Sequence, residues 1–273
     1  MMVNKVAFIG AGSMAEAVIA GMVNTKFLKN EQIYVTNKEN GARLEELNEK
    51  YGVVGSGSKK EVIEGADIIV FATKPVDMKN AIEDCKEFIQ KDQLIISVVA
   101  GISTEFIESN IEKDVAVIRT MPNTSATIGY AATAITKGRF ASDEDIQLAK
   151  RLFEAIGTVS VVTEEKMHIV TAISGSGPAY VYYLVEAMEK AAKEEGLPED
   201  VAKQLISQTV IGAGYMLKYA NEPTSILREN VTSPNGTTAA GLRTLNEYNF
   251  EEAVINCVKS ATKRSIELGK EIN

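Results

Sequence analysis

Short apolar runs alternate with segments of helical periodicity over the first part of the chain. Apolar, β-branched runs bounded by turn residues are typical of strands that are buried on both faces of a parallel sheet. Between them, apolar residues at helical spacing in residues 13–23, 42–51 and 142–156 indicate helices that pack on such a sheet. This alternation predicts a doubly wound α/β sheet. We expect its strands at residues 3–9, 32–36, 67–72, 94–99, 115–119, 131–136 and 159–162.

The pattern changes after Thr163, where the strand signals end. A helix is expected to open at Pro178, and Gly196 followed by Pro198 predicts the end of that helix and the start of another. Residues 209–217 of the second helix are apolar almost all round. We expect an N-terminal Rossmann-like α/β domain over residues 1–162 and an all-α domain over residues 163–273.

The helical domain raises a problem of burial. A helix that is apolar on every side must be buried on every side, and a small domain has little interior in which to bury it. We therefore expect this domain to be buried partly against another subunit, which makes the protein a homo-oligomer. The alternative is a monomer whose two domains cover each other.

Composition is that of an ordinary globular protein and narrows the range of partners. Hydrophobic residues make up 45% of the chain and charged residues 24%, and the net charge of −8 disfavours a nucleic-acid partner. No apolar run approaches the ~20 residues that a membrane span requires, and the amino terminus lacks the pattern of a signal peptide. The sequence therefore predicts a cytoplasmic protein with neither a nucleic-acid nor a membrane partner.

The cysteines and the single histidine suggest no metal site. Cys85 and Cys257 lie far apart without metal-ligand spacing, and both fall in apolar helical patterns, so we expect buried, reduced thiols. His168 is expected to be a surface or packing residue rather than a catalytic acid.

The strongest local motif follows the first expected strand and opens the first helix. In a dinucleotide-binding turn, the first glycine permits the sharp bend, the second lets a pyrophosphate approach the backbone, and a small third residue lets helix and strand pack together. The N–H groups of the helix start then face the phosphates. This context predicts a dinucleotide site, with a plain glycine turn as the alternative. The motif consists of Gly10, Ala11, Gly12, Ser13, Met14 and Ala15.

The end of the second expected strand bears on the choice of cofactor. An NAD-preferring site usually has a carboxylate there, whereas this chain has Asn37 and Lys38, with Arg43 close enough in sequence to help neutralise a ribose 2′-phosphate. Glu39 weighs against this interpretation, and solvated loop residues are the alternative. We expect NADPH to be preferred, with NADH also accepted.

Three later strand ends should line the same cofactor, because ligands of this fold lie beyond the carboxyl ends of the strands. The first should face the ribose, and the other two should flank the nicotinamide. Ordinary strand-to-loop turns are the alternative. The residues concerned are Ala72, Thr73, Lys74 and Pro75, then Ala100 and Gly101, and finally Asn123.

Two segments of the helical domain, residues 174–179 and 230–238, combine small residues and hydroxyl groups at helix starts. Exposed N–H groups at a helix start suit an anion such as a carboxylate, although Ser and Thr there also serve as simple caps. Neither segment contains His, Lys, Asp or Glu. A site of hydroxyl groups suits a protonated imine, since a ketone would require a proton donor for the alkoxide that forms.

Five segments together resemble the pyrroline-5-carboxylate reductase family in order and spacing, over nearly the whole chain. They read Gly-Ala-Gly-Ser-Met-Ala at residues 10–15, Thr-Lys-Pro at 73–75, Arg-Thr-Met-Pro-Asn-Thr at 119–124, Ser-Gly-Ser-Gly-Pro-Ala-Tyr at 174–180 and Val-Thr-Ser-Pro-Asn-Gly-Thr-Thr at 231–238. The resemblance implies an oxidoreductase that reduces the cyclic imine 1-pyrroline-5-carboxylate to L-proline with NADPH or NADH. It also implies interwoven helical dimerisation domains, with a decamer of five dimers in some members.

The resemblance assigns roles in the last segment. Thr238 matches the threonine that contacts the imine, Gly236 and Thr237 match positions whose backbone holds the carboxylate, and Asn230 matches a supporting polar position. The chain has Asn235 where many relatives have Gly, and Thr237 where many have Ala. The expected catalytic residue is Thr238, and the expected substrate-binding residues are Ser176, Gly177, Asn230, Ser233, Gly236, Thr237 and Thr238.

Two other functions stay open. A β-hydroxyacid dehydrogenase shares a similar N-terminal fold but places a catalytic lysine one turn into the helix that follows its glycine-rich segment. Here that turn carries no lysine, and the first one in the helix is Lys190. A dinucleotide-sensing scaffold without catalysis is the second alternative.

Overall fold

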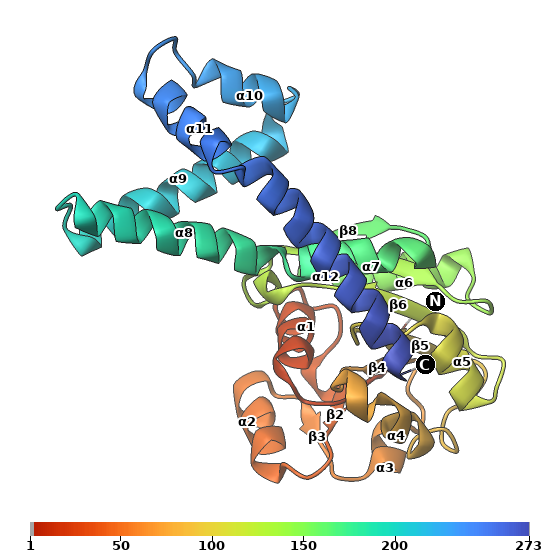
Figure 1. Ribbon diagram of the computed structural model, residues 1–273. Coiled ribbons are helices and arrows are strands. Elements are labelled where there is room, and N and C mark those ends of the chain that lie inside the picture. Colours follow the sequence, from red (N-terminus) through yellow and green to blue (C-terminus); the bar gives the residue numbers. More distant parts are fainter. Residues whose placement is uncertain (1–2, 273) are drawn as a thin grey trace. The chain divides into compact units, whose positions relative to one another are not determined.

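The computed structural model describes residues 3–272 and divides into two compact units. Unit 1 comprises the described residues up to Pro178 together with those from Lys259 onward, and unit 2 comprises Ala179–Val258. The long C-terminal helix therefore contributes to both units. Figure 1 shows the strands of unit 1 and the helices of unit 2.

Unit 1 contains an eight-stranded sheet in the order β3-β2-β1-β4-β5-β6-β7-β8. All neighbouring pairs are parallel except β6 and β7, which are antiparallel. The chain order reverses between β1 and β4, which creates the switch point where doubly wound sheets bind ligands. The predicted fold class is confirmed. The strands are β1 (Val6–Ile9), β2 (Ile33–Thr36), β3 (Val54–Gly55), β4 (Ile68–Phe71), β5 (Leu94–Ser97), β6 (Ala116–Met121), β7 (Ala131–Lys137) and β8 (Gly157–Val161).

Helices cover both faces of this sheet, and each face has its own apolar core. In β1, Phe8 belongs to the core that also contains Val18 and Phe153, whereas Ile9 belongs to the core that also contains Ile107. This alternation follows from the two-residue period of a strand. The helices of unit 1 are α1 (Ser13–Asn24), α2 (Gly41–Tyr51), α3 (Lys59–Ile63), α4 (Met78–Glu83), α5 (Thr104–Ile111), α6 (Asp143–Glu154) and α7 (Met167–Val170).

Short non-α turns complete unit 1. Four of those described are 3-10 turns: η1 (Asn30–Gln32), η2 (Pro75–Asp77), η3 (Thr124–Ile128) and η4 (Glu164–Lys166). The fifth, η5 (Thr171–Gly175), is a π-helical turn that follows α7 directly. Strand β3 and this π-helical turn were not predicted from the sequence.

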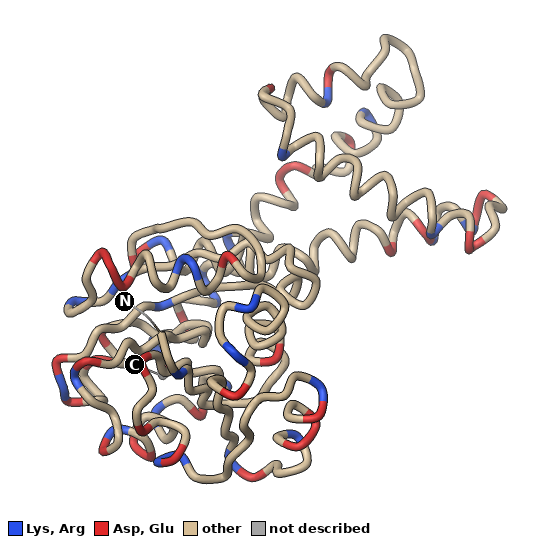
Figure 2. The backbone as a smooth tube through the Cα atoms, turned by 180° about the vertical axis from the view of Figure 1, so that it is seen from behind, with Lys and Arg blue, Asp and Glu red and all other residues tan. Residues whose placement is uncertain are grey.

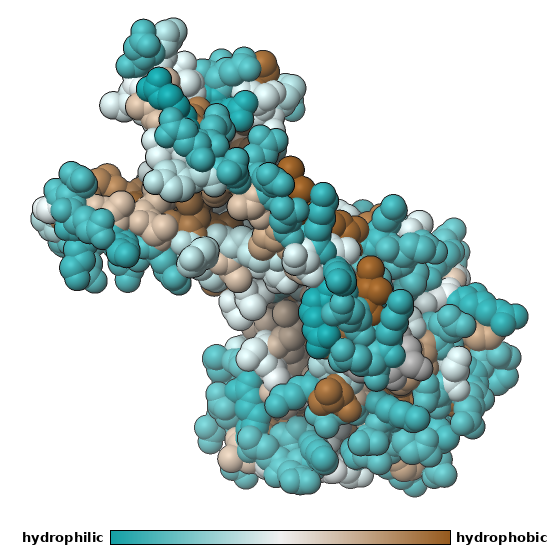
Figure 3. Space-filling view, viewed as in Figure 1, coloured by the Kyte–Doolittle hydropathy of each residue, from teal (hydrophilic) through white to brown (hydrophobic). Residues whose placement is uncertain are grey.

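Unit 2 consists of helices and buries very little by itself. In its described residues, Ala202 and Ile206 are the only buried hydrophobic side chains. Figure 3 shows hydrophobic side chains along α8 and α9, and Figure 2 shows uncharged stretches of these helices. The helices are α8 (Gly177–Glu194), α9 (Glu199–Tyr219), α10 (Thr224–Asn230), α11 (Thr237–Glu247) and the first part of α12 (Phe250–Ile272).

The chain divides into its two compact units after Pro178 and again before Lys259, rather than after residue 162 as expected. Residues beyond the last strand stay attached to unit 1, because Asn123 Nδ2 donates to the Ser174 carbonyl at 3.0 Å. The end of α12 returns to the same unit, where Ser265 Oγ lies 3.0 Å from His168 Nδ1. His168 is therefore a packing residue, and burial lowers its pKa.

The two cysteines differ. Cys85 is buried as expected, and burial raises the pKa of its thiol to about 12. The expectation of burial is wrong for Cys257, which is exposed because it lies on the part of α12 within unit 2, where the single chain buries few side chains. Among residues 3–272, no helix is long and apolar enough to cross a bilayer.

Candidate active site

The turn between β1 and α1 contains Gly10 and Gly12, and the surroundings of these two glycines differ. Gly10 has a φ of +116°, and a Cβ there would lie 2.4 Å from the Ala72 carbonyl oxygen, so only glycine fits. A Cβ on Gly12 would meet no atom within 4 Å, so no packing inside the chain requires this glycine. Gly12 is also the N-cap of α1, and no side chain caps that helix. An open backbone at an uncapped helix start suits a phosphate group.

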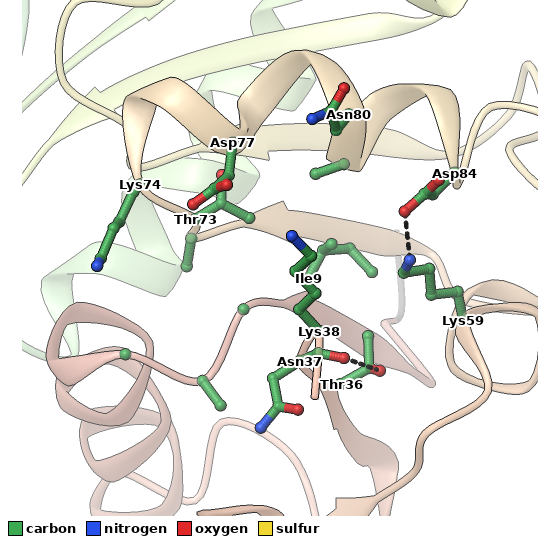
Figure 4. A pocket seen from close by; sticks show the side chains of 15 residues that line it. Ile9, Thr36, Asn37, Lys38, Lys59, Thr73, Lys74, Asp77, Asn80 and Asp84 are labelled. Carbon is green, nitrogen blue, oxygen red and sulfur yellow. Dashed lines mark hydrogen bonds and ion pairs between the residues drawn. The ribbon is translucent and has the colours of Figure 1, made fainter. Parts of the chain in front are cut away.

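A cavity of about 260 Å³ lies beyond this turn, and Figure 4 shows the side chains that line it. It contains three lysines and two aspartates, so its lining carries a net positive charge that suits a polyphosphate. Eight of the expected cofactor residues line it: Gly10, Ala11, Gly12, Asn37, Lys38, Ala72, Thr73 and Lys74. Six do not: Ser13, Met14, Pro75, Ala100, Gly101 and Asn123.

One wall of the cavity was missed by sequence reasoning. Lys59 from α3 and Asp84, just after α4, form an ion pair at 2.5 Å there, and Figure 4 shows them facing each other. Asp77, Asn80 and Ala81 complete this wall. These residues lie in or beside short helices rather than at strand ends, and their sequence carries no motif that would have identified them.

The polar residues after β2 are tied into a turn. Asn37 Nδ2 donates to the Asn40 carbonyl at 2.6 Å, and the Asn40 N–H donates to Asn37 Oδ1 at 2.9 Å. This pair of bonds fixes the loop that carries Lys38 beside the cavity. The amide of Asn37 thus shapes the loop in addition to lining the cavity.

Arg43 does not line the cavity as its place in the sequence suggested. Its Nε donates to the Ala11 carbonyl at 3.0 Å, and its guanidinium is paired with Glu16 and Glu46. Hydrogen bonds from Lys50 and then from Arg43 lower the pKa of Glu16 to about 2. Arg43 therefore joins α2 to the phosphate-binding turn, and its guanidinium already has two carboxylate partners.

The residues that follow β5 and β6 contact different segments. Gly101 has a φ of +80°, and a Cβ there would lie 3.6 Å from the Gly269 nitrogen of α12. Asn123 is buried, and its bond to the Ser174 carbonyl joins an expected cofactor residue to an expected substrate segment.

Residues 174–179 differ from the open helix start that the sequence predicted. Residues 171–175 form the π-helical turn, and the Ser176 N–H donates to the Thr171 carbonyl at 2.8 Å. The N–H groups expected to be free here are thus partly used within a nearly continuous helix. A Cβ on Gly177 would meet no atom within 4 Å, so its backbone is open to a ligand. Single π-helical turns often mark functional sites.

In unit 2, the turn before α11 forms the uncapped helix start that the sequence predicted. Asn235 has a φ of +59°, a conformation that Asn tolerates better than most non-glycine residues. A Cβ on Gly236 would lie 2.3 Å from Ser233 Oγ and 3.2 Å from the Ser233 carbonyl oxygen, so a larger residue here would displace the Ser233 hydroxyl. Gly236 is the N-cap of α11, and no side chain caps the helix.

Thr238 lies in the first turn of α11 and is half-buried. It does not cap the helix, because the N-cap is Gly236 and no side-chain cap bond is formed. Asn230 is exposed, and its Nδ2 donates to Glu222 Oε2 at 3.1 Å. The first-turn N–H groups of α11 therefore remain available to an anion, with the Thr238 hydroxyl beside them.

These features define a class of protein. A glycine turn, an uncapped helix start and a positively charged cavity at the switch point of a doubly wound sheet are the parts of a Rossmann dinucleotide-binding site. Residues 5–101 match the family of NADP oxidoreductases described as coenzyme F420-dependent. Residues 164–268 match the pyrroline-5-carboxylate reductase dimerisation family.

Whole-chain comparisons identify the family more narrowly. Pyrroline-5-carboxylate reductase 1 of Bacillus subtilis (strain 168) is 46% identical over 268 residues, which cover 98% of this chain and 90% of that protein. The structure of a pyrroline-5-carboxylate reductase from Coxiella burnetii has a TM-score of 0.90 at 33% identity and covers 98% of this chain and 99% of that one. The chain belongs to the pyrroline-5-carboxylate reductase family.

A second structure bears on the cofactor. The Plasmodium falciparum pyrroline carboxylate reductase with NADP bound has a TM-score of 0.89 at 28% identity, covering 98% of this chain and 99% of that one.

Proposed function

We propose that this protein reduces the C=N bond of 1-pyrroline-5-carboxylate with NAD(P)H and produces L-proline, the last step of proline biosynthesis. Membership of the family over 98% of the chain carries this proposal. The cofactor supplies the hydride when it is bound. The open backbone at Gly12 and the lysines of the cavity fit its phosphates.

NADPH is the preferred cofactor in this proposal. No carboxylate directly follows β2, and Lys38 lines the cavity at the place where a ribose would enter. The Plasmodium falciparum relative binds NADP. Because Arg43 is paired with Glu16, we assign the neutralisation of a 2′-phosphate to Lys38 and not to Arg43.

The substrate is held by backbone N–H groups and hydroxyls. The first-turn N–H groups of α11, at Thr237 and Thr238, bind the carboxylate, and the Thr238 hydroxyl faces the imine nitrogen. Ser176 and Gly177 contact the substrate ring, while Asn230 and Ser233 support the turn. A protonated imine already carries the positive charge that attracts hydride, so this set needs no strong acid and its task is to position the ring.

The active protein is a homodimer in this proposal. Unit 2 belongs to the dimerisation family, and α9 exposes Ile211, Tyr215, Met216 and Leu217 in the single chain. A second copy of the same chain would cover these side chains. Assembly into a decamer and a cytoplasmic location stay predictions.

An assay that follows both NADPH and L-proline tests the proposed activity. Purified protein is mixed with NADPH and 1-pyrroline-5-carboxylate, and the loss of absorbance at the wavelength specific to reduced nicotinamide is followed while L-proline is quantified. We expect one proline for each NADPH oxidised. Oxidation of a β-hydroxyacid with NADP⁺ in the same preparation would favour the dehydrogenase alternative, whereas tight NADPH binding without turnover would favour the sensing scaffold.

A further inference from the structure

Arg119 is the largest side chain that is fully buried in the described structure. It lies on β6, and only 2% of its side chain is exposed. Its Nη1 pairs with Glu164 Oε1, while its Nη2 is buried without a hydrogen-bond partner among the described residues. A buried charge with an unsatisfied donor is costly, and an apolar side chain of similar volume would pack here at less cost. Stability alone therefore does not account for an arginine at this position.

Glu164, the ion-pair partner of Arg119, is the first residue of the segment that leads to the expected substrate-binding residues Ser176 and Gly177. Glu164 is the first residue of η4, which leads directly through α7 and the π-helical turn to Ser176. The second carboxylate oxygen of Glu164 accepts a hydrogen bond from Thr104 Oγ1 at 3.4 Å. The carboxylate is thus held from β6 and from the start of α5, and the start of the segment is fixed with it.

Strand β6 and the extended residues just beyond its end contact the same segment at two further points. Alternate residues of an extended chain point to the same side, which places Met121 and Asn123 on the side of Arg119. The Met121 methyl group lies 2.6 Å from the position that a Cβ on Gly175 would occupy, so the segment packs directly on it. Asn123 donates to the Ser174 carbonyl at 3.0 Å. Side chains on one side of β6 and of its extension to Asn123 therefore hold the segment at its beginning and at its π-helical end.

We propose that Arg119 is a positioning residue for substrate binding, which acts by fixing residues 164–177 through its ion pair with Glu164. This proposal rests on the proposed function, since it requires that Ser176 and Gly177 bind the substrate. The planar guanidinium sets both the distance and the direction of the pair, which a methylene chain or a lysine does not. Displacement of the segment moves Ser176 and Gly177 relative to Asn123 and leaves the phosphate-binding turn at Gly10 untouched.

The test is the double variant Arg119→Met/Glu164→Leu, which removes both charges and leaves no buried charge unpaired. We expect a folded protein that binds NADPH as the wild type does. Its KM for the cyclic imine should rise about ten-fold or more, with a smaller change in kcat, because ground-state positioning is lost. Amide hydrogen exchange in residues 171–177 should accelerate. Arg119→Lys, which keeps the charge but loses the planar fork, should show the same changes to a lesser degree.

The control variant removes an ion pair that also lies in unit 1 but is exposed. Lys137→Gln/Asp143→Asn deletes an ion pair of 2.6 Å between β7 and α6 and should leave KM and exchange unchanged. If Arg119→Met/Glu164→Leu loses only thermal stability, with KM and exchange normal, the positioning role is refuted. If it does not fold, the same two readouts on Arg119→Lys decide. Absence of imine reduction by the wild type would refute the proposed function instead, and the exchange measurement would still test whether Arg119 holds the segment.

Discussion

The two units of this chain bury their apolar residues in opposite ways. Unit 1 has an apolar core on each face of its sheet, and all four residues of β1 and of β4 are buried. Unit 2 contains α8 and α9, of 18 and 21 residues, which are longer than the helices α1–α7 of unit 1. Helix α9 carries no charged residue between Lys203 and Lys218 and still exposes most of that stretch. A large exposed apolar surface on a folded chain marks an interaction surface. The first unit therefore buries its apolar residues within one chain, whereas the second exposes the surface that we propose a second copy covers.

The largest effect is expected from a charge placed in the incomplete unit. Ala213 lies in the uncharged stretch of α9 and is exposed in the single chain. Ala213→Glu should abolish the dimer or prevent folding, because an unpaired charge buried between subunits is very costly. Ala42→Glu, at an exposed helical alanine of unit 1, is the matched control and should leave the assembly unchanged. Sedimentation velocity distinguishes the two, and a normal dimer of Ala213→Glu would show that this surface is not the interface.

The next effect concerns catalysis in unit 2. Thr238→Ala removes the hydroxyl but keeps the backbone N–H groups of α11, so kcat should fall by roughly ten- to hundred-fold, about 1.4–2.7 kcal/mol, with a smaller change in KM. The melting temperature should hardly change, because Gly236 and not Thr238 is the N-cap. Thr237→Ala should affect kcat less. A Thr238→Ala protein with normal kcat and lowered thermal stability would mean that the threonine serves only the helix.

The third prediction concerns the cofactor preference of unit 1. Asn37→Asp adds a negative charge beside Lys38 and replaces a donor to the Asn40 carbonyl with a second acceptor. The ratio of kcat/KM for NADPH to that for NADH should fall about ten-fold, or about 1.4 kcal/mol. Asn37→Ser, which opens the same turn without adding charge, separates repulsion from a change of loop shape. An unchanged ratio for Asn37→Asp would place the ribose away from this residue.

The smallest effect concerns the charge cluster behind the phosphate-binding turn. The pKa of Glu16 is lowered to about 2, so its ion pairs stabilise the folded state above its ordinary value of 4.5, and this contribution is lost as the pH falls through about 2. Glu16→Gln should reduce the free energy of unfolding by about 1 kcal/mol at pH 7, with allowance for solvent screening. Urea unfolding at pH 7 and pH 3 should show a smaller difference from wild type at the lower pH. A difference independent of pH would contradict the electrostatic explanation.

The sequence predicted the sheet well because burial on both faces leaves a clear signal. The runs that became β4 and β5 are almost entirely apolar, and each is buried along its whole length. Strand β3 was missed because its two residues are too short to show a period. The π-helical turn was missed because its shape depends on contacts with Met121 and Asn123, which lie about fifty positions earlier and leave no local pattern.

The site was predictable where backbone geometry restricts the residue type. Gly10 could be identified from its position after the first strand, since the bend there admits only glycine. Side-chain partners were not predictable in the same way. Arg43 is held by Glu16, and Lys59 by Asp84, because α1, α2, α3 and α4 come together only in the folded chain. Sequence proximity to the cofactor motif therefore gave no hint of the ion pairs of Arg43 or of the place of Lys59 in the cavity wall.

Sedimentation of the catalytically active species addresses both units at once, because it measures activity and assembly in one experiment. A thin band of dilute protein is sedimented through a solution of NADPH and 1-pyrroline-5-carboxylate, and the moving boundary of oxidised cofactor reports the size of the enzyme that works. We predict an active band of at least twice the 29.5 kDa of one chain at every dilution, with L-proline recovered behind it. An active band with the mass of a single chain would show that unit 2 needs no partner, and a dimer that oxidises no NADPH would refute the proposed reaction.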